Sequence, residues 1–306
     1  MRPLPAAMAL VLCTSAFAQT VPPEILSRIA EEAEVLRQNA PKVLSQETLE
    51  QRAVMPPSRF RPRVGAAATQ VSKPRLAVRE VVSEYSVGTL HDSDSHDLLE
   101  FRQVISVDGR KIQSAESARR ALSLGVHSQD DRTRKRMLED FAKHGLVDVA
   151  TDYALILLAF SKRGLAEMKL ESVGFEQIGA DQAVKIHWKQ MSTTGGELEF
   201  RGRQMTRRSL EGLLWARKSD GLPIRVTAWA EHIDNKHTIR DEGTIDYVLS
   251  QHGFVTPVSV VHRHVVDNGL VTENLYRYEP FKLFGADSDI KFTAEPDPVP
   301  TPPTKK

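Results

Sequence analysis

Histidines and carboxylates in the second half of the chain come nearest to the composition of a metal site. His262 and His264 are two residues apart on an expected strand, so both imidazoles point to one face. Further ligand types lie close by in sequence: His232, Asp234, His237, Asp241 and Glu242. Two imidazoles with a carboxylate suit zinc, whereas histidines on an exposed sheet face are simply solvated. The sequence leaves open whether His262 and His264 bind metal, and we assign no metal and no cofactor.

The sequence holds weaker signals for a second metal site and none of the enzyme or nucleotide-binding motifs searched for. The stretch from His91 to His96 holds two histidines and two aspartates in an expected hairpin tip, without a required ligand spacing. No G-x-S-x-G nucleophile turn, phosphate-binding loop or dinucleotide-binding motif is present. The single cysteine, Cys13, lies in the leader described below. We therefore predict that the protein is not an enzyme.

Basic residues gather in two places, which could meet anionic headgroups or phosphate or could form a solvated polar face. The first cluster is Arg201, Arg203, Arg207 and Arg208, and the second is Arg132, Arg134, Lys135 and Arg136. Over the whole chain 41 basic residues face 40 acidic ones, for a net charge of +1. This balance gives no general attraction for nucleic acid, so we expect no nucleic-acid partner.

Residues 1–18 have the three parts of a secretory signal peptide. Arg2 supplies the positive start, residues 6–13 a short apolar run, and Ala16-Phe17-Ala18 a small-x-small cleavage pattern. Cys13 is interpreted as an apolar leader residue rather than a lipidation site, because Leu12 stands where a lipoprotein signal has a small residue. We expect cleavage near Ala18 and export to the periplasm or beyond. No later apolar run reaches membrane-spanning length, so no transmembrane segment is expected.

The first half is predicted to be largely helical before a sheet begins. Apolar residues recur near helical spacing over residues 23–53, with Pro41 expected to break the helix in two. This gives an N-terminal helical segment at 19–54, followed by a linker at 55–74 that is rich in proline and arginine. An antiparallel β domain is expected over 75–293.

A helical insertion is expected within that domain, near 114–160. One helix starts near Ser114 and runs to about residue 124. A second is expected over residues 128–144, capped by Ser128, with Met137, Leu138 and Phe141 on one face. The most apolar segment, residues 152–160, is expected to be a buried third helix.

After Lys169 the chain alternates between apolar strand patterns and tight turns. Expected strands are Leu170–Ile178, Ala183–Gln190, Leu210–Arg217, Ile224–His232, Thr238–Leu249, Val255–Val266 and Leu270–Tyr278. Asp108-Gly109, Asp220-Gly221 and Asp267-Asn268-Gly269 are hairpin signals. Hairpins at this spacing predict an α+β fold with a curved antiparallel sheet. The tail, 294–306, is rich in proline and is expected to be disordered.

Three patterns of strands and turns lie within residues 165–292: a strand pair, a hairpin with a tryptophan and a proline, and a closing aromatic pattern. These are residues 170–186, residues 211–226, and Tyr247, Phe254-Val-Thr-Pro257, Tyr276-Arg-Tyr-Glu-Pro-Phe281, Phe284 and Ser288-Asp-Ile290. In these patterns the region resembles the periplasmic lipoprotein-carrier (Lol-type, outer-membrane lipoprotein-sorting) superfamily. The resemblance implies a half-barrel with helices on its concave face. The long helical N-terminal section departs from the short carriers.

A half-barrel either fills its interior with side chains or leaves a cavity for a ligand. The resemblance implies a concave apolar groove that carries a lipid or lipoprotein acyl chain. Expected lining residues are Leu213, Trp215, Val226, Ala228, Tyr247, Val258, Val260 and Tyr276. The alternative is an envelope interaction module with a filled core, no ligand and a protein partner. Whether the helices of the insertion plug the concave face decides between the two.

Overall fold

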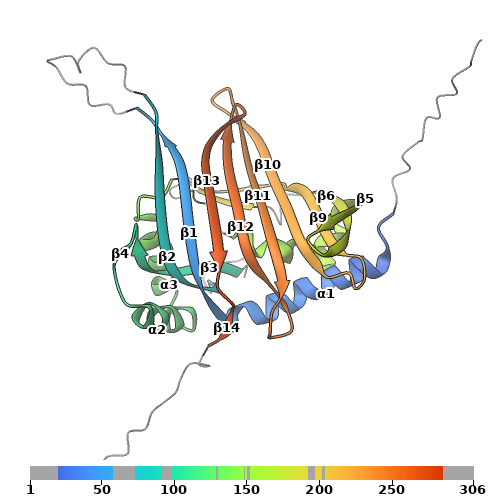
Figure 1. The fold of residues 1–306 in the computed structure, drawn as a ribbon, viewed down its shortest axis with the longest axis horizontal. Helices are drawn as coiled ribbons and strands as arrows, with labels where there is room; N and C mark the ends of the chain where they lie inside the picture. The colour runs from blue at the N-terminus through green and yellow to red at the C-terminus, as the bar shows by residue number, and fades with distance from the viewer. Residues whose placement is uncertain are drawn as a thin grey trace, which may run out of the picture.

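A computed structural model describes residues 20–57, 73–90, 98–128, 130–147, 149, 152–191, 197–201 and 204–284. Its centre is one antiparallel sheet of 12 strands in the order β4-β3-β2-β1-β13-β12-β11-β10-β9-β6-β5, with β14 paired to β1. The sheet is curved and does not close into a barrel (Figure 1). The predicted α+β half-barrel is therefore confirmed.

The interpretation of residues 43–53 as helix is wrong. Helix α1 covers Pro23–Asn39, a short 3-10 turn, η1, covers Ala40–Lys42, and β1 then runs over Val43–Met55. From Ser45 onward, buried residues alternate with more exposed ones, which is the strand period of two. β1 pairs with both β2 and β13, so these residues form a central strand of the sheet.

Three further strands and two helices follow β1 in the chain (Figure 1). Their bounds are β2 Arg75–Thr89, β3 Leu98–Val107, β4 Arg110–Lys111, α2 Ala115–Val126 and α3 Asp131–Ala142. α2 starts next to Ser114, as predicted, and Ser114 caps it by accepting a hydrogen bond from the Ser117 amide. α3 is capped by Asp130 rather than Ser128. Met137 packs with Phe101 in a small second core, while Phe141 joins the main core.

The most apolar segment is a 3-10 helix, η3, over Tyr153–Phe160, followed by α4 over Lys162–Ala166. Eight residues are long for this helix type, whose hydrogen bonds are weaker than those of an α-helix. Tyr153, Ala154, Leu155, Leu157 and Phe160 are all buried in the main core. Packing against the sheet and α1 therefore stabilises η3 more than its own backbone hydrogen bonds do.

The strands expected after Lys169 are present, and a small separate hairpin, β7–β8, is added. The bounds are β5 Met168–Ile178, β6 Asp181–Gln190, β7 Glu197–Arg201, β8 Gln204–Arg208, β9 Glu211–Arg217, β10 Pro223–Asp234, β11 His237–Leu249, β12 Val255–Val266, β13 Gly269–Tyr278 and β14 Lys282–Leu283. Asp267 and Asn268 both have positive φ between β12 and β13, as the predicted tight turn requires. The leader, residues 91–97 and the tail lie outside the described residues.

Candidate functional site

The concave face of the sheet carries one apolar residue from each of eight neighbouring strands, all in register. We call this row the apolar strip: Val81, Leu49, Tyr276, Val260, Ile245, Val226, Leu214 and Ile186. None of its side chains is more than 2% exposed. An acyl-chain groove in this fold would need an apolar strip of this kind. Whether such a groove is open depends on what covers the strip.

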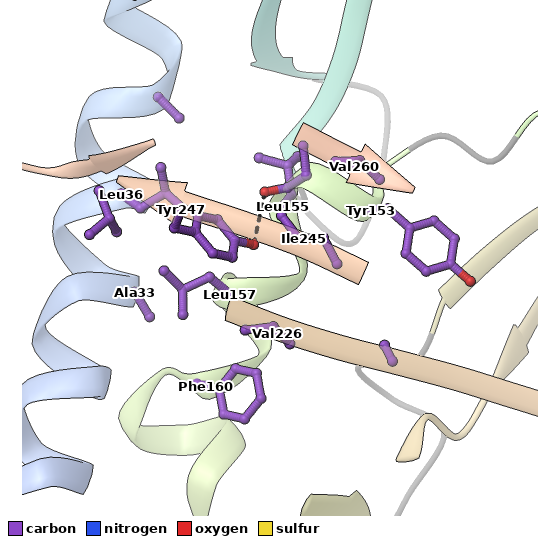
Figure 2. Packing of buried hydrophobic residues seen from close by; sticks show 14 of the residues in the cluster. Ala33, Leu36, Tyr153, Leu155, Leu157, Phe160, Val226, Ile245, Tyr247 and Val260 are labelled. Atoms are coloured by element: carbon purple, nitrogen blue, oxygen red, sulfur yellow. Dashed lines mark hydrogen bonds between the residues drawn. The ribbon is translucent and has the colours of Figure 1, made fainter. Parts of the chain in front are cut away.

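The apolar strip is covered by the chain's own residues. Figure 2 shows Leu157 of η3 between α1, which carries Ala33 and Leu36, and the strands that carry Val226 and Tyr247. The Tyr247 hydroxyl donates a hydrogen bond of 3.2 Å to the Ala154 carbonyl, and this bond ties η3 to β11. Burial raises the pKa of Tyr247 far above its usual value, so its hydroxyl keeps its proton. Side chains of η3 and α1 therefore occupy the space above the strip.

On one side of the apolar strip lies a buried ion cluster formed by Glu47, Glu100 and Arg102. Arg102 donates from Nε and Nη2 to the two carboxylate oxygens of Glu47, at 2.7 and 2.8 Å, and from Nη2 to Glu100 Oε2 at 2.5 Å. Burial raises the pKa of Glu47, and the opposing charge of Arg102 limits that rise. Glu100 Oε1 also accepts the Ala154 amide at 3.1 Å, so the cluster fixes the start of η3.

Three aromatic rings enclose the guanidinium of Arg102. Its Cζ lies 5.0, 5.2 and 5.5 Å from the ring centres of Phe141, Tyr85 and Tyr276. Cation–π contacts of this kind strengthen where water is excluded. The cluster is thus enclosed by its own neighbours, and we assign it a structural role.

On the other side of the strip lies a second buried polar group, which we call the histidine row: Gln51, Asn274, His262, Asp241 and His264. Gln51 Nε2 donates to Asn274 Oδ1 at 2.6 Å, and the Asn274 amide nitrogen lies 3.1 Å from His262 Nδ1. Asp241 Oδ1 lies 2.6 Å from His264 Nδ1 and 3.7 Å from His262 Nε2. The carboxylate of Asp241 on β11 therefore contacts two imidazoles of β12.

Asp241 is the charged centre of the histidine row. Burial alone would raise its pKa, but hydrogen bonds from His262 and His264 outweigh burial and hold the pKa well below its usual range. The Tyr153 ring centre lies 5.1 Å from the His262 ring, and a Cβ on Gly243 would stand 2.2 Å from Tyr153 Cδ1. The ring can sit this close only because residue 243 has no side chain.

The predicted histidine site is thus assembled, but as a hydrogen-bonded row. In the parts of the chain that the structure describes, no group of three or more His, Cys, Asp or Glu side chains is placed to hold a metal ion. The expectation that strand histidines are solvated is wrong for His262 and His264, which are buried. His237 instead bonds to Asp267 in an exposed turn pair. The pair His91 and His96 lies outside the described residues.

The eight expected lining residues separate into three groups. Five lie in the main core on the concave face: Val226, Ala228, Tyr247, Val260 and Tyr276. Leu213 and Trp215 belong to a separate small cluster with Ala183 and Ile224, while Val258 is 37% exposed. The side chains of a strand alternate, so on β9 it is Leu214 that enters the main core.

One basic cluster also differs from the expectation of exposed charge. Arg134 is buried, and its guanidinium donates to the Asp131 carboxylate and to the Val126 carbonyl, the latter at 3.2 Å. It therefore holds α3 to the end of α2 and is not part of a positive surface. Of the other cluster, Arg203 and the side chains of Arg201 and Arg207 lie outside the described structure.

Sequence reasoning missed the ion cluster and two of the five residues of the histidine row, Gln51 and Asn274. Glu47 and Gln51 were hidden by the helical interpretation of residues 43–53. Their signal was present, because Glu47, Leu49, Gln51 and Ala53 share one face if the segment is a strand. Polar residues on the buried face of a strand require partners, and that requirement points to a buried network.

No family model matches the chain, and no curated protein matches its sequence. Among solved structures it is similar to a DUF1329 family protein from Desulfovibrio piger, with 11% identity, a TM-score of 0.33, and coverage of 87% of this chain and 96% of the other. It is also similar to a putative outer membrane lipoprotein-sorting protein domain from Vibrio parahaemolyticus, with 10% identity, a TM-score of 0.31, and coverage of 86% of this chain and 94% of the other. A third similar structure is MucB in complex with MucA(peri), with 10% identity, a TM-score of 0.18, and coverage of 83% of this chain and 98% of the other.

An outer membrane lipoprotein-sorting domain is thus among the structures to which the chain is similar, and this is the class that residues 165–292 resemble. At these identities and TM-scores the likeness carries no inference about activity, ligand or partner. Within the described residues, no helix combines the length and apolar character needed to cross a membrane.

Proposed function

We propose that this chain is an exported, non-catalytic binding module of the cell envelope whose interior is filled by its own side chains. The secretory pattern of residues 1–18 supports export. The observation that carries the filled interior is the apolar strip, where η3 and α1 occupy the place that an acyl chain would take. Binding then falls to outer surfaces rather than to a preformed cavity.

The absence of enzymatic activity is part of the same proposal. The two buried polar groups are the places where catalysis would be sought. In the ion cluster, Arg102 is hydrogen-bonded to two carboxylates and enclosed by three aromatic rings. In the histidine row, Asp241 contacts two imidazoles of one strand, and the ring of His262 packs against that of Tyr153. Both arrangements fit structural roles.

A second candidate, carriage of an acyl chain, is favoured by one observation. The strip beneath η3 is apolar across eight strands, and η3 is itself a 3-10 helix. An acyl chain that displaced η3 would gain about 0.8 kcal/mol for each buried CH₂ group. The strip would then serve as the groove that the resemblance implies.

Solvent extraction and mass spectrometry of the full chain, purified from the exported fraction, separate the two candidates. We expect no acyl lipid at a stoichiometric level. A Leu157→Ala variant provides the matched comparison, because it opens space directly above the strip. Lipid in the variant alone supports a filled native interior, whereas one lipid per native chain overturns the proposal in favour of acyl carriage.

A further inference from the structure

The end of the β1–β2 hairpin extends beyond its neighbours in the sheet. β1 and β2 stay paired as far as Met55 and Arg75, whereas β13 pairs with β1 only as far as Ala53. On the other side, the pairing of β2 with β3 begins only at Val81. Figure 1 shows this end of the hairpin at the upper left of the sheet. Among the described residues, the last residues of this hairpin have no neighbouring strand on either side.

Three apolar side chains are exposed together on the outer face of this hairpin end. Val54 and Leu76 are directly opposite each other, and Val78 follows Leu76 on the same face of β2. Their exposed fractions are 43%, 64% and 58%. Exposed apolar residues are unremarkable when single, but a contiguous set indicates an interaction surface.

The same part of the chain carries a concentrated positive charge. Residues 51–79 contain seven of the 41 basic residues and none of the 40 acidic ones, so the rest of the chain is net negative. Of the described basic residues, Arg52 pairs with Glu50 and Arg79 with Asp108. Lys73 and Arg75 are exposed at the start of β2, and neither has an ion-pair partner among the described residues. Arg75 leaves β2 on the face opposite to Leu76, so the cations lie at the same hairpin end as the apolar side chains rather than among them.

Exposed apolar side chains and exposed cations at one hairpin end match one kind of surface in particular. At the boundary of an anionic bilayer, cations lie among the headgroups while small apolar side chains reach the acyl region. Because the rest of the molecule is net negative, an anionic surface attracts this end and repels the remainder, which orients the molecule.

We propose that the end of the β1–β2 hairpin docks on an anionic lipid surface, with Val54, Leu76 and Val78 on its outer face and with Lys73 and Arg75 supplying positive charge at the same end. The inference rests on the proposed export, which brings the chain to an envelope membrane, but it does not depend on a filled interior. It supplies the outer binding surface that the proposed module requires.

Vesicle co-sedimentation of the full exported chain tests this docking surface. The probes are vesicles of equal parts phosphatidylglycerol and phosphatidylcholine, compared with phosphatidylcholine alone. We expect binding to the anionic vesicles only, weakened by added salt. Each basic residue near an anionic surface contributes roughly a fivefold factor in affinity. The double variant Lys73→Glu with Arg75→Glu should therefore bind at least about tenfold more weakly.

Matched variants make the result specific to this hairpin. Arg110→Glu with Lys111→Glu changes the charge equally on exposed β4, and Leu124→Ser removes an exposed leucine from α2. Both should bind as the native chain does, whereas Leu76→Ser should weaken binding. Absent binding, equal binding to both vesicle types, or equal losses in the β4 variant would overturn the inference. Failure of vesicle binding would leave the proposed filled interior untouched, because lipid extraction tests the interior separately. The failure of one proposal can therefore be distinguished from the failure of the other.

Discussion

The two buried polar groups on the concave face lie on either side of the same apolar strip but use different chemistry. The ion cluster places one permanently charged guanidinium between two carboxylates and encloses it with aromatic rings. The histidine row joins neutral amides to imidazoles and a single carboxylate, Asp241. Burial opposes the charge of Arg102, but Glu47 and Glu100 outweigh burial and raise the pKa of its guanidinium, whereas His262 and His264 lower the pKa of Asp241. The first group holds the start of η3 through Arg102 and Glu100, and the second makes a contribution to stability that depends on the ionisation of Asp241.

The largest effect should come from removing the cation of the ion cluster. Arg102→Met leaves Glu47 and Glu100 buried without a counter-charge, and we expect a loss of about 3–5 kcal/mol in the free energy of unfolding. Urea unfolding at neutral pH measures it. Adding Glu47→Gln and Glu100→Gln to Arg102→Met should recover much of the loss, because no uncompensated charge then remains. A loss below about 1 kcal/mol in the single variant would mean that the cluster is solvated.

A somewhat smaller effect is expected above the apolar strip that separates the two polar groups. Leu157→Ala removes a fully buried side chain of η3 and should cost about 3 kcal/mol, because the sheet and α1 can close the space only partly. Leu158→Ala, next in sequence and only partly buried, is the matched control and should cost clearly less. Equal losses in the two variants would show that η3 does not use one particular face to cover the strip.

The histidine row should make a contribution to stability that is lost in acid. Its hydrogen bonds lower the folded-state pKa of Asp241, so its stabilisation is present above the unfolded pKa of about 3.9 and is lost as pH falls through the folded value. Asp241→Asn should cost about 1–3 kcal/mol near neutral pH. Urea unfolding at several pH values should show the difference between native chain and variant shrinking below about pH 4.

Asp267→Asn is the matched control for this pH dependence. Asp267 also has its pKa lowered by a histidine, His237, but both side chains are largely exposed. Solvent screens an exposed pair, so its removal should change stability less than Asp241→Asn does. If the two variants behave alike at every pH, burial does not strengthen the histidine row.

Most of the sheet could be predicted from the sequence, because its strands are separated by turn residues with local conformational requirements. Asp267 and Asn268 are an example, since their positive φ values are those of the expected tight turn. β1 was missed because Ile25 to Leu49 present apolar residues near helical spacing, and pattern alone does not show where a helix gives way to a strand. Its place between β2 and β13 depends on pairing with residues far away in sequence.

The candidate site was predictable only in part for a similar physical reason. Inward-facing positions such as Val226 and Val260 follow from alternation within a strand, whereas Leu213 and Trp215 lie on the other face because the phase of β9 is set by its neighbours. The two histidines of β12 were visible as a pair, but their carboxylate partner is fixed by the register of β11 against β12. Which of several nearby acids meets them is a tertiary property.

The smallest effect should come from an arginine that resembles Arg102 in its partners but not in its burial. Arg263, on the outer face of β12, also contacts two carboxylates, Glu273 at 2.9 Å and Glu242 at 3.8 Å, yet its side chain is 46% exposed. Water and salt screen these pairs, so Arg263→Gln should change stability by less than about 0.5 kcal/mol, and by less still at high salt. Urea unfolding beside Arg102→Met then compares two arginines, each between two carboxylates. Equal losses would mean that the number of ion pairs, rather than their removal from water, sets the stability of this sheet.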